Sequence, residues 1–494
     1  MQNEKVNTRY FVIIGALLIQ LSLGAIYAWS VFTTPLTSAG WSKADTQIIF
    51  SIGLAVFALV MILSGRLIPK IGPLKLSLAG ALALGLGYIL AGVFYIEPNT
   101  INITTETLDK ILPLLSSPSE LANIKGLSHT AKIDRFMPLF VTTEGLEKIK
   151  PFLSIDIIKS IHIIKELVSR NLVLLIIFLG VVGGAGIGLT YVVPIAVGMR
   201  WYPDKKGMIT GLSVAGFGFG ALLWIKLAGN WGNLIQNNGL GVTFIIYGIV
   251  FLITIVIGSI WMVFPPDGWK PKNWKVDITN NNLISTNEVI NLTSNQMLRT
   301  HQFYMIFFTF LFGASAGLMS IGLMKLFPRE ALVANGIDII SANAITGTAM
   351  GVFFALANGL GRIGWGFISD KIGRKLSLFI MTILQGLMMI LFPYMAGTTE
   401  LLYFASALIG FNYGGNFALF PAITSDIFGN KNIGSNYAWV FLSYGIGGIF
   451  GPVMGGILGD LNNFPLAFTI SGILCVIAAL TIAFVNKPKL TINT

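Results

Sequence analysis

Apolar runs of about 20 residues recur along this chain, and short polar segments that carry most of its charges separate them. An α-helix of that length crosses the hydrocarbon layer of a bilayer, which is about 30 Å thick. The pattern therefore predicts twelve transmembrane helices, six in each half of the chain. Their expected ranges are 10–33, 47–69, 74–95, 172–198, 207–228, 241–264, 302–325, 340–367, 376–396, 400–424, 434–458 and 464–486.

Two longer polar segments interrupt this rhythm. Residues 265–300 are rich in proline, asparagine and charge, as expected of a linker. Residues 96–170 contain pieces with helical periodicity, DKILPLL and SIDIIKSIHIIKELVSR, and form either a small cap over the outer mouth or a tolerated insertion without a functional role. We expect an all-α membrane protein with a six-helix bundle at 1–264 that includes the extracytoplasmic insertion 96–170, a cytoplasmic linker at 265–300 and a second six-helix bundle at 301–494.

Composition excludes several classes of protein. Hydrophobic residues make up 54% of the chain and charged residues 11%, which excludes an ordinary soluble domain. The net charge of +11 resides mainly in short loops, so it predicts membrane orientation, with both termini in the cytoplasm, rather than binding of nucleic acid. A single cysteine and three scattered histidines predict no disulfide, metal site or cofactor, and no nucleophile and base pair or nucleotide motif indicates an enzyme.

The two halves repeat each other at fixed offsets. GRLIPKIGPLK at 65–75 aligns with GFISDKIGRK at 366–375, an offset of 366 − 65 = 301. PIAVGMRWYPDKKG at 194–207 aligns with PAITSDIFGNKNIG at 421–434, an offset of 421 − 194 = 227. Such repeats are typical of transporters built from two related bundles.

The second copy of the first repeat has the residues for a conformational latch. An acid at a helix end, followed by glycine and a basic cluster, can bond to a neighbouring helix in one conformation and release it in another. Asp370, Lys371, Gly373, Arg374 and Lys375 fit this pattern. The first copy has Pro69 and Pro73 at the positions of the acid and the arginine, so we expect no latch there.

Five motifs in order resemble one known family. GAIYAWSVF, RWYPDKKGMITGL, LRTHQFYMIFF, ANGLGRIGWGFISDKIGR and FALFPAITSDIFG are similar to motifs of the oxalate/formate antiporter family, within the major facilitator superfamily. The resemblance covers the chain except the insertion 96–170. It implies a bundle of twelve helices in two pseudo-symmetric halves. It also implies a multi-pass protein of the plasma membrane, which we expect to be a bacterial inner membrane.

Arg362 is the candidate binding residue that stands out from the residues alone. It lies eight residues, or about 12 Å along a helix, before Asp370, and no Asp or Glu stands deep in any predicted span to neutralise it. A charge placed there without a counterion suits a carboxylate, which a guanidinium holds bidentately. The alternative is an arginine that reaches the inner headgroups.

The resemblance adds further expectations about the site. In the family the arginine engages substrate together with a lysine in the eleventh span, but Tyr444 stands at the position of that lysine here. One cation suits a monoanion better than a dianion, because an unpaired buried charge is costly. The family also presents aromatic rings to its substrate, at positions that match Tyr27, Tyr191, Phe217, Tyr413 and Phe441. Gln20, Asn412 and Asn416 either add hydrogen bonds or bond across helices.

The sequence thus predicts a monomeric carrier of small carboxylate anions such as formate, lactate or pyruvate, whose partners are the anion and the lipid bilayer. The alternatives are an oxalate/formate exchanger, a carrier of a non-carboxylate solute, and a membrane sensor that has kept the fold. The lack of a deep acid favours exchange or facilitated movement over proton symport.

Overall fold

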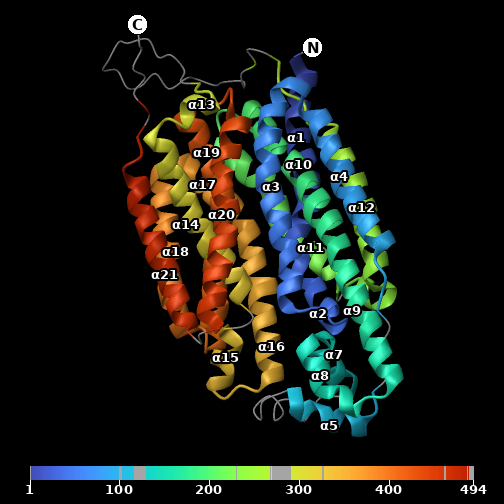
Figure 1. Cartoon of the computed structure of the whole chain (residues 1–494). Helices are drawn as coiled ribbons and strands as arrows, with labels where there is room; N and C mark the ends of the chain where they lie inside the picture. The colour runs from blue at the N-terminus through green and yellow to red at the C-terminus, as the bar shows by residue number, and fades with distance from the viewer. Residues whose placement is uncertain are drawn as a thin grey trace.

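The computed structural model describes residues 2–98, 103–115, 129–229, 231–266, 269, 291–324, 327–460, 463–486 and 488, and most of the predicted linker 265–300 lies outside them. All regular secondary structure in these residues is helical, as predicted (Figure 1). The first six membrane segments are α1 (Gln2–Leu23), α3 (Lys43–Ile71), α4 (Pro73–Phe94), α9 to α10 (Ile155–Trp201), α11 (Lys206–Ala228) and α12 (Leu234–Ser259). The second six are α14 (His301–Leu323), α16 to α17 (Ile339–Ile372), α18 (Arg374–Met395), α19 (Thr399–Phe428), α20 (Ile433–Asp460) and α21 (Phe464–Ala483).

Eleven of these segments contain an apolar stretch long enough to be recognised as a membrane span by composition. The twelfth, α19, is 30 residues long and spans the bundle beside them, but it carries the buried Asn412 and Asn416 in its middle. Both amides face the protein interior, so they lower the hydropathy of α19 without meeting lipid. The predicted twelve-helix architecture is therefore confirmed.

Two segments differ from their predicted ranges. The first predicted span is interrupted, since α1 gives way to the 3₁₀ helix η1 (Gly24–Trp29) and then to α2 (Ser30–Ser38). Gly24 lies against the backbone of Phe217, where any side chain would overlap it, so the chain lies very close to α11 at the change of geometry. The fourth span begins much earlier than residue 172, because α9 continues through the π-helical segment η3 (Ile176–Gly183) into α10 as one long helix.

The repeat offsets found in the sequence recur in the backbone. Helix α4 begins at Pro73 and ends at Phe94, and α18 begins and ends 301 residues later, at Arg374 and Met395. The glycines that precede them, Gly72 and Gly373, have matching left-handed conformations with φ of 83° and 90°. Likewise α20 begins 227 residues after α11, at 433 against 206. The halves are therefore structural repeats.

The halves meet along two seams that the repeat relates to each other. One seam packs α3 on α20 and the other packs α11 on α17. Gly65 crosses Gly434 in the first, and Gly366 crosses Gly207 in the second, so closely that a methyl group at Gly65 or at Gly366 would overlap the backbone of the facing glycine. The two pairs are equivalent by the repeat offsets, since Gly366 lies 301 residues after Gly65 and Gly434 lies 227 residues after Gly207. Small residues thus allow the two bundles to approach closely on both sides.

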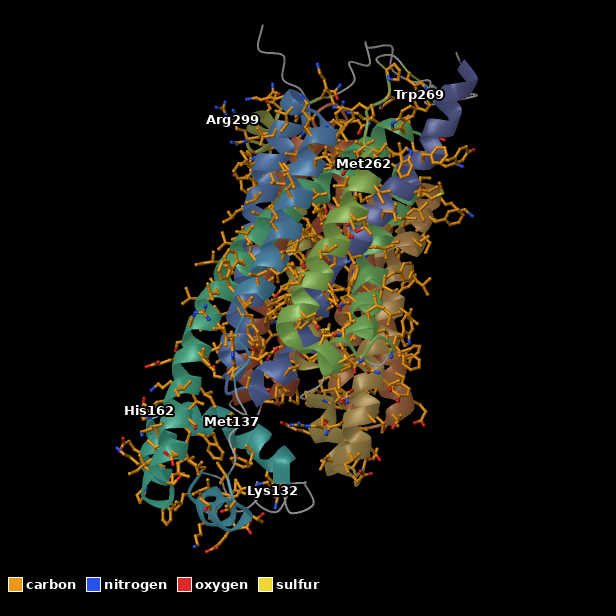
Figure 2. All side chains as sticks on the ribbon, turned by 90° about the vertical axis from the view of Figure 1, so that its right-hand side faces the viewer. Lys132, Met137, His162, Met262, Trp269 and Arg299 are labelled. Carbon is orange, nitrogen blue, oxygen red and sulfur yellow. The ribbon has the colours of Figure 1, made fainter. Side chains whose placement is uncertain are left out.

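The two ends of the bundle are unlike each other. We call the end where α1 begins and α21 ends the terminal end, and the opposite end the insertion end (Figure 1). Met262, Trp269 and Arg299 lie near the terminal end, whereas Lys132, Met137 and His162 lie beyond the insertion end (Figure 2). All of the predicted latch residues belong to the terminal end.

The insertion forms a small helical unit at its own end of the bundle. Its helices are α5 (Thr105–Leu115), α7 (His129–Val141), α8 (Thr143–Ile149), the short η2 (Lys150–Phe152) and the first turns of α9, which confirms the helical periodicity read from the sequence. Its apolar core includes Leu108, Phe136, Phe140 and Ile161, and α7 packs on α2. The remaining short helices are α13 (Ser294–Met297) and α15 (Phe327–Ala334).

Candidate functional site

Arg362 lies in the middle of the bundle, fully buried on α17. It is ten residues, or about 15 Å, from the last residue of that helix, which is roughly half the thickness of a hydrocarbon layer. Its Nε donates to Oδ1 of Asn358 at 3.0 Å, and its Nη1 donates to the backbone carbonyl of Val214 on α11 at 3.0 Å. Its side chain therefore points into the space between the halves rather than toward a membrane surface.

The guanidinium is incompletely satisfied. Its Nη2 has no hydrogen-bond partner, and it forms no ion pair with any carboxylate of the described residues. Two aromatic rings lie beside it, with their centroids 4.1 Å (Phe417) and 5.3 Å (Phe217) from Cζ. Rings offset only part of the cost of burying a cation, so the group retains a strong preference for an anionic partner.

Local sequence explains how Arg362 is held. Asn358 lies one helical turn before it on α17, so its amide is placed beside Nε. Gly211 on α11 lies directly against the backbone carbonyl of Arg362, where a side chain would overlap it. This close crossing brings the Val214 carbonyl within reach of the guanidinium from the other half.

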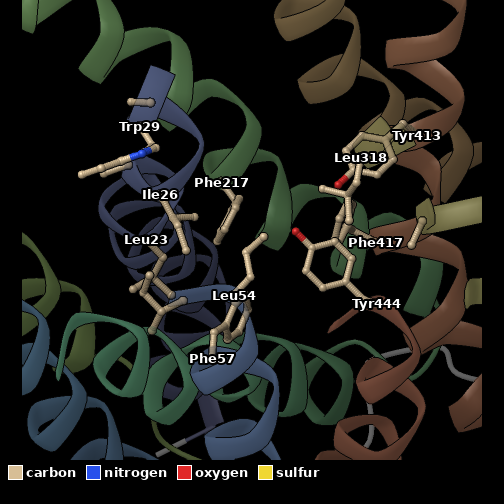
Figure 3. Close-up of a cluster of buried hydrophobic side chains, with 14 of the residues drawn as sticks. Leu23, Ile26, Trp29, Leu54, Phe57, Phe217, Leu318, Tyr413, Phe417 and Tyr444 are labelled. Atoms are coloured by element: carbon tan, nitrogen blue, oxygen red, sulfur yellow. The ribbon is translucent and has the colours of Figure 1, made fainter. Parts of the chain in front are cut away.

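The aromatic residues expected around the arginine do gather there. The ring of Tyr27, from η1, meets Phe217 at 5.0 Å, and Tyr191, from α10, meets Phe217 at 5.5 Å and Phe441 at 5.2 Å. Phe441 and Tyr444, both from α20, are 4.8 Å apart. Tyr413 joins them through Phe417, so these residues form one continuous cluster to which both halves contribute. Figure 3 shows Phe217 from the first half and Tyr413, Phe417 and Tyr444 from the second.

Three tyrosine hydroxyls meet at the centre of this cluster. The Tyr27 hydroxyl bonds to that of Tyr413 at 3.2 Å and also to that of Tyr444. Tyr27 belongs to the first half of the chain and the other two belong to the second, so these bonds cross between the halves. We call these three residues the tyrosine triad.

The three polar residues predicted from the sequence form hydrogen bonds next to the aromatic cluster. Gln20 donates to the backbone carbonyl of Tyr191 at 3.2 Å, and Asn416 donates to that of Tyr413 at 3.1 Å. Asn412 accepts from the indole of Trp365 at 3.1 Å. They thus bond within and between helices, the second of the two uses expected for them.

Of the charged residues predicted to form the latch, two take part in ion pairs and two do not. Asp370 accepts hydrogen bonds from the backbone amides of Gly207 at 3.0 Å and Met208 at 2.7 Å, in the first turn of α11. It also pairs with Arg374, one turn along and just after Gly373. An anion at the amino end of a helix is favourable, so Asp370 ties the second half to the first.

A second acid extends this network. Asp426, at the end of α19, pairs with Nε of Arg374 at 3.1 Å and with Nζ of Lys206 at 3.0 Å. Lys371 lies over the ring of Phe367 instead, and Lys375 donates to Asn486 at 3.5 Å. From here on, the name latch refers to the four residues of this ion-pair network, Lys206, Asp370, Arg374 and Asp426, rather than to the set predicted from the sequence.

Four residues around the site were not identified from the sequence, and two of them have a local signal that could have found them. Phe417 lies one turn after Tyr413, and Asn358 lies one turn before Arg362, so helical spacing from a recognised residue would have found both. Phe57, 5.1 Å from the ring of Tyr191, and Asp426 have no such signal, because only the packing of distant helices brings them in.

Comparison with known proteins agrees with this architecture. The Major Facilitator Superfamily matches residues 327–493. The uncharacterized MFS-type transporter YhjX of Escherichia coli (strain K12) is 26% identical over 447 residues, which cover 90% of this chain and 86% of the relative. The oxalate:formate antiporter of Oxalobacter formigenes is 29% identical over 303 residues, which cover 61% of this chain and 67% of that protein.

A solved structure shows the same fold. It is a bacterial homologue of the iron transporter ferroportin in an outward-facing state, with a TM-score of 0.58 and 13% identity, over 96% of this chain and 98% of the other. At that identity the likeness concerns the fold and not the substrate. The twelve helices in two repeated halves and the matches above indicate a membrane transporter that is similar to transporters of the major facilitator superfamily, among them the oxalate:formate antiporter.

Proposed function

We propose that this transporter carries small monocarboxylate anions such as formate, lactate or pyruvate, with Arg362 as the counterion of the bound carboxylate. The observation that carries the proposal is a fully buried guanidinium that has a free Nη2 and no acid beside it among the described residues. A carboxylate would supply the missing charge and accept from Nη2. The surrounding rings would keep water out of the bound state and strengthen that bond.

The preference for a single negative charge rests on Tyr444. It occupies the position at which the resemblance places a second cation, and its hydroxyl is neutral and bonded to Tyr27. The second carboxylate of oxalate would then be buried among neutral groups, which is costly. We therefore place oxalate/formate exchange, the activity in the name of one relative, second to monocarboxylate transport.

Transport would proceed by rocking of the two bundles about this central site. The latch and the glycine crossings join the halves at the terminal end, so we propose that this end faces the cytoplasm and is closed in this conformation. The cations near it, among them Arg66, Lys70 and Lys75, support this orientation. A bacterial inner membrane and a monomeric carrier, with domains at 1–264 and 301–494, complete the proposal.

The test is transport by purified protein in liposomes. Labelled formate, lactate and pyruvate are offered to the wild type and to Arg362→Gln, with oxalate as a competitor. We expect Arg362→Gln to lose at least about 100-fold in carboxylate uptake, because a buried charged partner is removed. Arg299, an exposed arginine just before α14, provides the matched control, and we expect Arg299→Gln to keep wild-type uptake. Unchanged carboxylate uptake by Arg362→Gln would favour a carrier of a non-carboxylate solute.

A further inference from the structure

The equivalents of the four latch residues on the α3–α20 seam carry no charge. By the repeat offsets they are Pro69 for Asp370, Pro73 for Arg374, Ile433 for Lys206 and Met199 for Asp426. The backbones nevertheless approach each other at Gly65 and Gly434 as closely as on the α11–α17 seam. Contacts other than ion pairs between these positions therefore hold the terminal end of the α3–α20 seam together.

The end of α10 makes two such contacts with the second half. The side-chain amide of Asn430 donates to the backbone carbonyl of Met199 at 3.3 Å, and Nη2 of the half-buried Arg200 donates to the backbone carbonyl of Lys431 at 2.9 Å. Asn430 and Lys431 belong to the loop between α19 and α20. Neutral acceptors thus join the halves here, where the latch uses carboxylates.

The chain that enters the linker is fixed to the same end of α10. The ring of Phe264 lies beside the guanidinium of Arg200, with its centroid 3.8 Å from Cζ. The indole of Trp201 donates to the backbone carbonyl of Val263 at 2.8 Å and meets the ring of Trp269 at 5.0 Å. Trp269 lies near the terminal end of the bundle (Figure 2). A cation on an aromatic face and a bonded indole both stabilise this arrangement.

The chain that leaves the linker is fixed to the α19–α20 loop. Oδ1 of Asn291 accepts from the backbone amide of Lys431 at 3.1 Å, and the backbone amide of Leu292 donates to the carbonyl of Phe428 at 2.9 Å. The carbonyl of Leu292 accepts from the fully buried side-chain amide of Asn436 at 3.0 Å. These bonds fix the position of Lys431, whose carbonyl Arg200 reaches from the first half.

Both ends of the linker therefore meet at Arg200. Its guanidinium lies against Phe264 at the entry to the linker and bonds to Lys431, which the exit from the linker holds through Asn291. Phe264 is attached to the first half and Lys431 belongs to the second, so opening the terminal end would break the bond between Arg200 and Lys431. We call Arg200, Phe264, Asn291 and Lys431 the linker clasp.

We infer that the linker clasp holds the terminal end closed on the α3–α20 side, in place of the charged latch that this seam lacks. The linker thereby helps to set how readily the transporter changes conformation. The clasp acts on the proposed rocking of the bundles, so the inference rests on that part of the proposed function and not on the carboxylate cargo. A hydrogen bond from a charged group contributes more than one between neutral groups, which makes Arg200 the main residue of the clasp.

The experiment measures thiol labelling of purified protein in nanodiscs, where both ends are accessible, without any solute. The reporter is Ala196→Cys in a Cys475→Ser background, because Ala196 is buried on α10 beside Gly434 of the second half. Opening the terminal end exposes this position. We expect Arg200→Gln to raise the labelling rate at least about fivefold, and Phe264→Leu about twofold.

Arg9→Gln is the matched control. Arg9 lies at the same end, pairs with Asp204 at 2.9 Å and lies 3.7 Å from the ring centroid of Tyr202, and both of these partners belong to the first half. Labelling of the reporter in this variant should stay within about twofold of its rate without the substitution. The native Cys475, buried within the second half, should stay unlabelled in Arg200→Gln. An equal rise at Cys475 would overturn the inference, because Arg200 would then stabilise the fold and not the closed conformation.

A double substitution tests whether the two ends of the linker act together. Asn291→Ala should raise labelling of the reporter about twofold, and combining it with Arg200→Gln should add nothing to Arg200→Gln alone, because both residues act through Lys431. Independent effects of the two substitutions, or unchanged labelling in Arg200→Gln, would overturn the inference. Neither result changes the expected carboxylate uptake of the wild type, so the failure of the clasp and the failure of the proposed function are distinguishable.

Discussion

The two seams between the halves have the same glycine crossings, but one carries charged residues where the other carries methionine and prolines. At the α11–α17 seam the second half contributes Arg362 and Asp370 from α17 and Arg374 from the start of α18. The equivalent residues, 301 positions earlier, are Met61 and Pro69 on α3 and Pro73 at the start of α4. Both seams keep their glycine crossings, so close packing does not require the charges. The charged residues of the α11–α17 seam are therefore not required for this close packing.

Along the α11–α17 seam the two arginines also differ from each other. Arg374, in the latch, has two carboxylate partners, and Arg362, in the centre, has none among the described residues. The first arginine is satisfied by the protein itself, and under the proposed function the second is satisfied by the bound anion. The following predictions alter one of these differences at a time.

The largest effect should come from giving Arg362 an acid of its own. Asn358→Asp keeps the shape of the side chain but places a carboxylate 3.0 Å from Nε. The guanidinium would then be neutralised as Arg374 is, and we expect carboxylate affinity to fall by at least about 100-fold. Asn358→Ala, which removes the bond without adding charge, should cost about tenfold or less. Inhibition constants in proteoliposomes measure both, and wild-type affinity in Asn358→Asp would show that Arg362 is not the counterion.

Removing the latch should shift the conformation of the carrier. Arg374→Gln leaves Asp370 and Asp426 without their shared cation, and losing about 1.4 kcal/mol of net stabilisation shifts a two-state equilibrium tenfold. The readout is thiol labelling from the terminal end at Ser425→Cys, a buried position beside Asp426, in a Cys475→Ser background. We expect labelling to rise about tenfold.

The other seam supplies the control for this experiment. Arg66→Gln removes a cation that lies over the ring of Trp439, 5.5 Å from its centroid, and pairs with no carboxylate of the described residues. Its labelling should stay within about twofold of the wild type. Equal effects of Arg374→Gln and Arg66→Gln would mean that the latch is no stronger than any other contact between the halves.

Adding a second cation to the centre should change selectivity by a smaller factor. Tyr444→Lys provides a partner for a second carboxylate, so inhibition by oxalate relative to formate should rise about tenfold. Tyr444→Met, of similar length without charge, separates the charge from the loss of the triad. The same ratio in both variants would contradict the single-cation account of the wild-type preference.

The smallest effects belong to the two basic residues of the motif that lie outside the latch. Lys371→Gln and Lys375→Gln remove charges that pair with no carboxylate in the described residues and are exposed at the terminal end. Transport should stay within about twofold of the wild type for each. A loss as large as that of Arg374→Gln would mean that these lysines act as the motif suggests rather than as their contacts indicate.

The sequence predicted those features that depend on local pattern. Apolar length identified all twelve spans, even α19, where Asn412 and Asn416 dilute the hydropathy. The repeats at offsets of 301 and 227 were read from short motifs, and the helix starts follow the same offsets. Arg362 could be identified because a charge in the middle of a span is costly and therefore conspicuous.

Features that depend on contacts between distant helices were not predictable in this way. Asp426 joins the latch from a helix that begins after Asp370 and Arg374, and nothing in its own segment marks it as their partner. The carbonyl of Val214 reaches Arg362 only because Gly211 lets α11 and α17 cross closely. The change to a 3₁₀ helix at Tyr27 likewise coincides with the close approach of Gly24 to Phe217.

Equilibrium binding to purified protein tests the central claim most directly. The ligand is whichever of formate, lactate and pyruvate inhibits transport most strongly, titrated into the wild type, Arg362→Gln and the exposed-site control Arg299→Gln. We expect one saturable anion per chain in the wild type and in Arg299→Gln, and no measurable binding to Arg362→Gln over the same range. Wild-type affinity in Arg362→Gln would contradict the account, because the anion would then be held by groups other than the buried guanidinium.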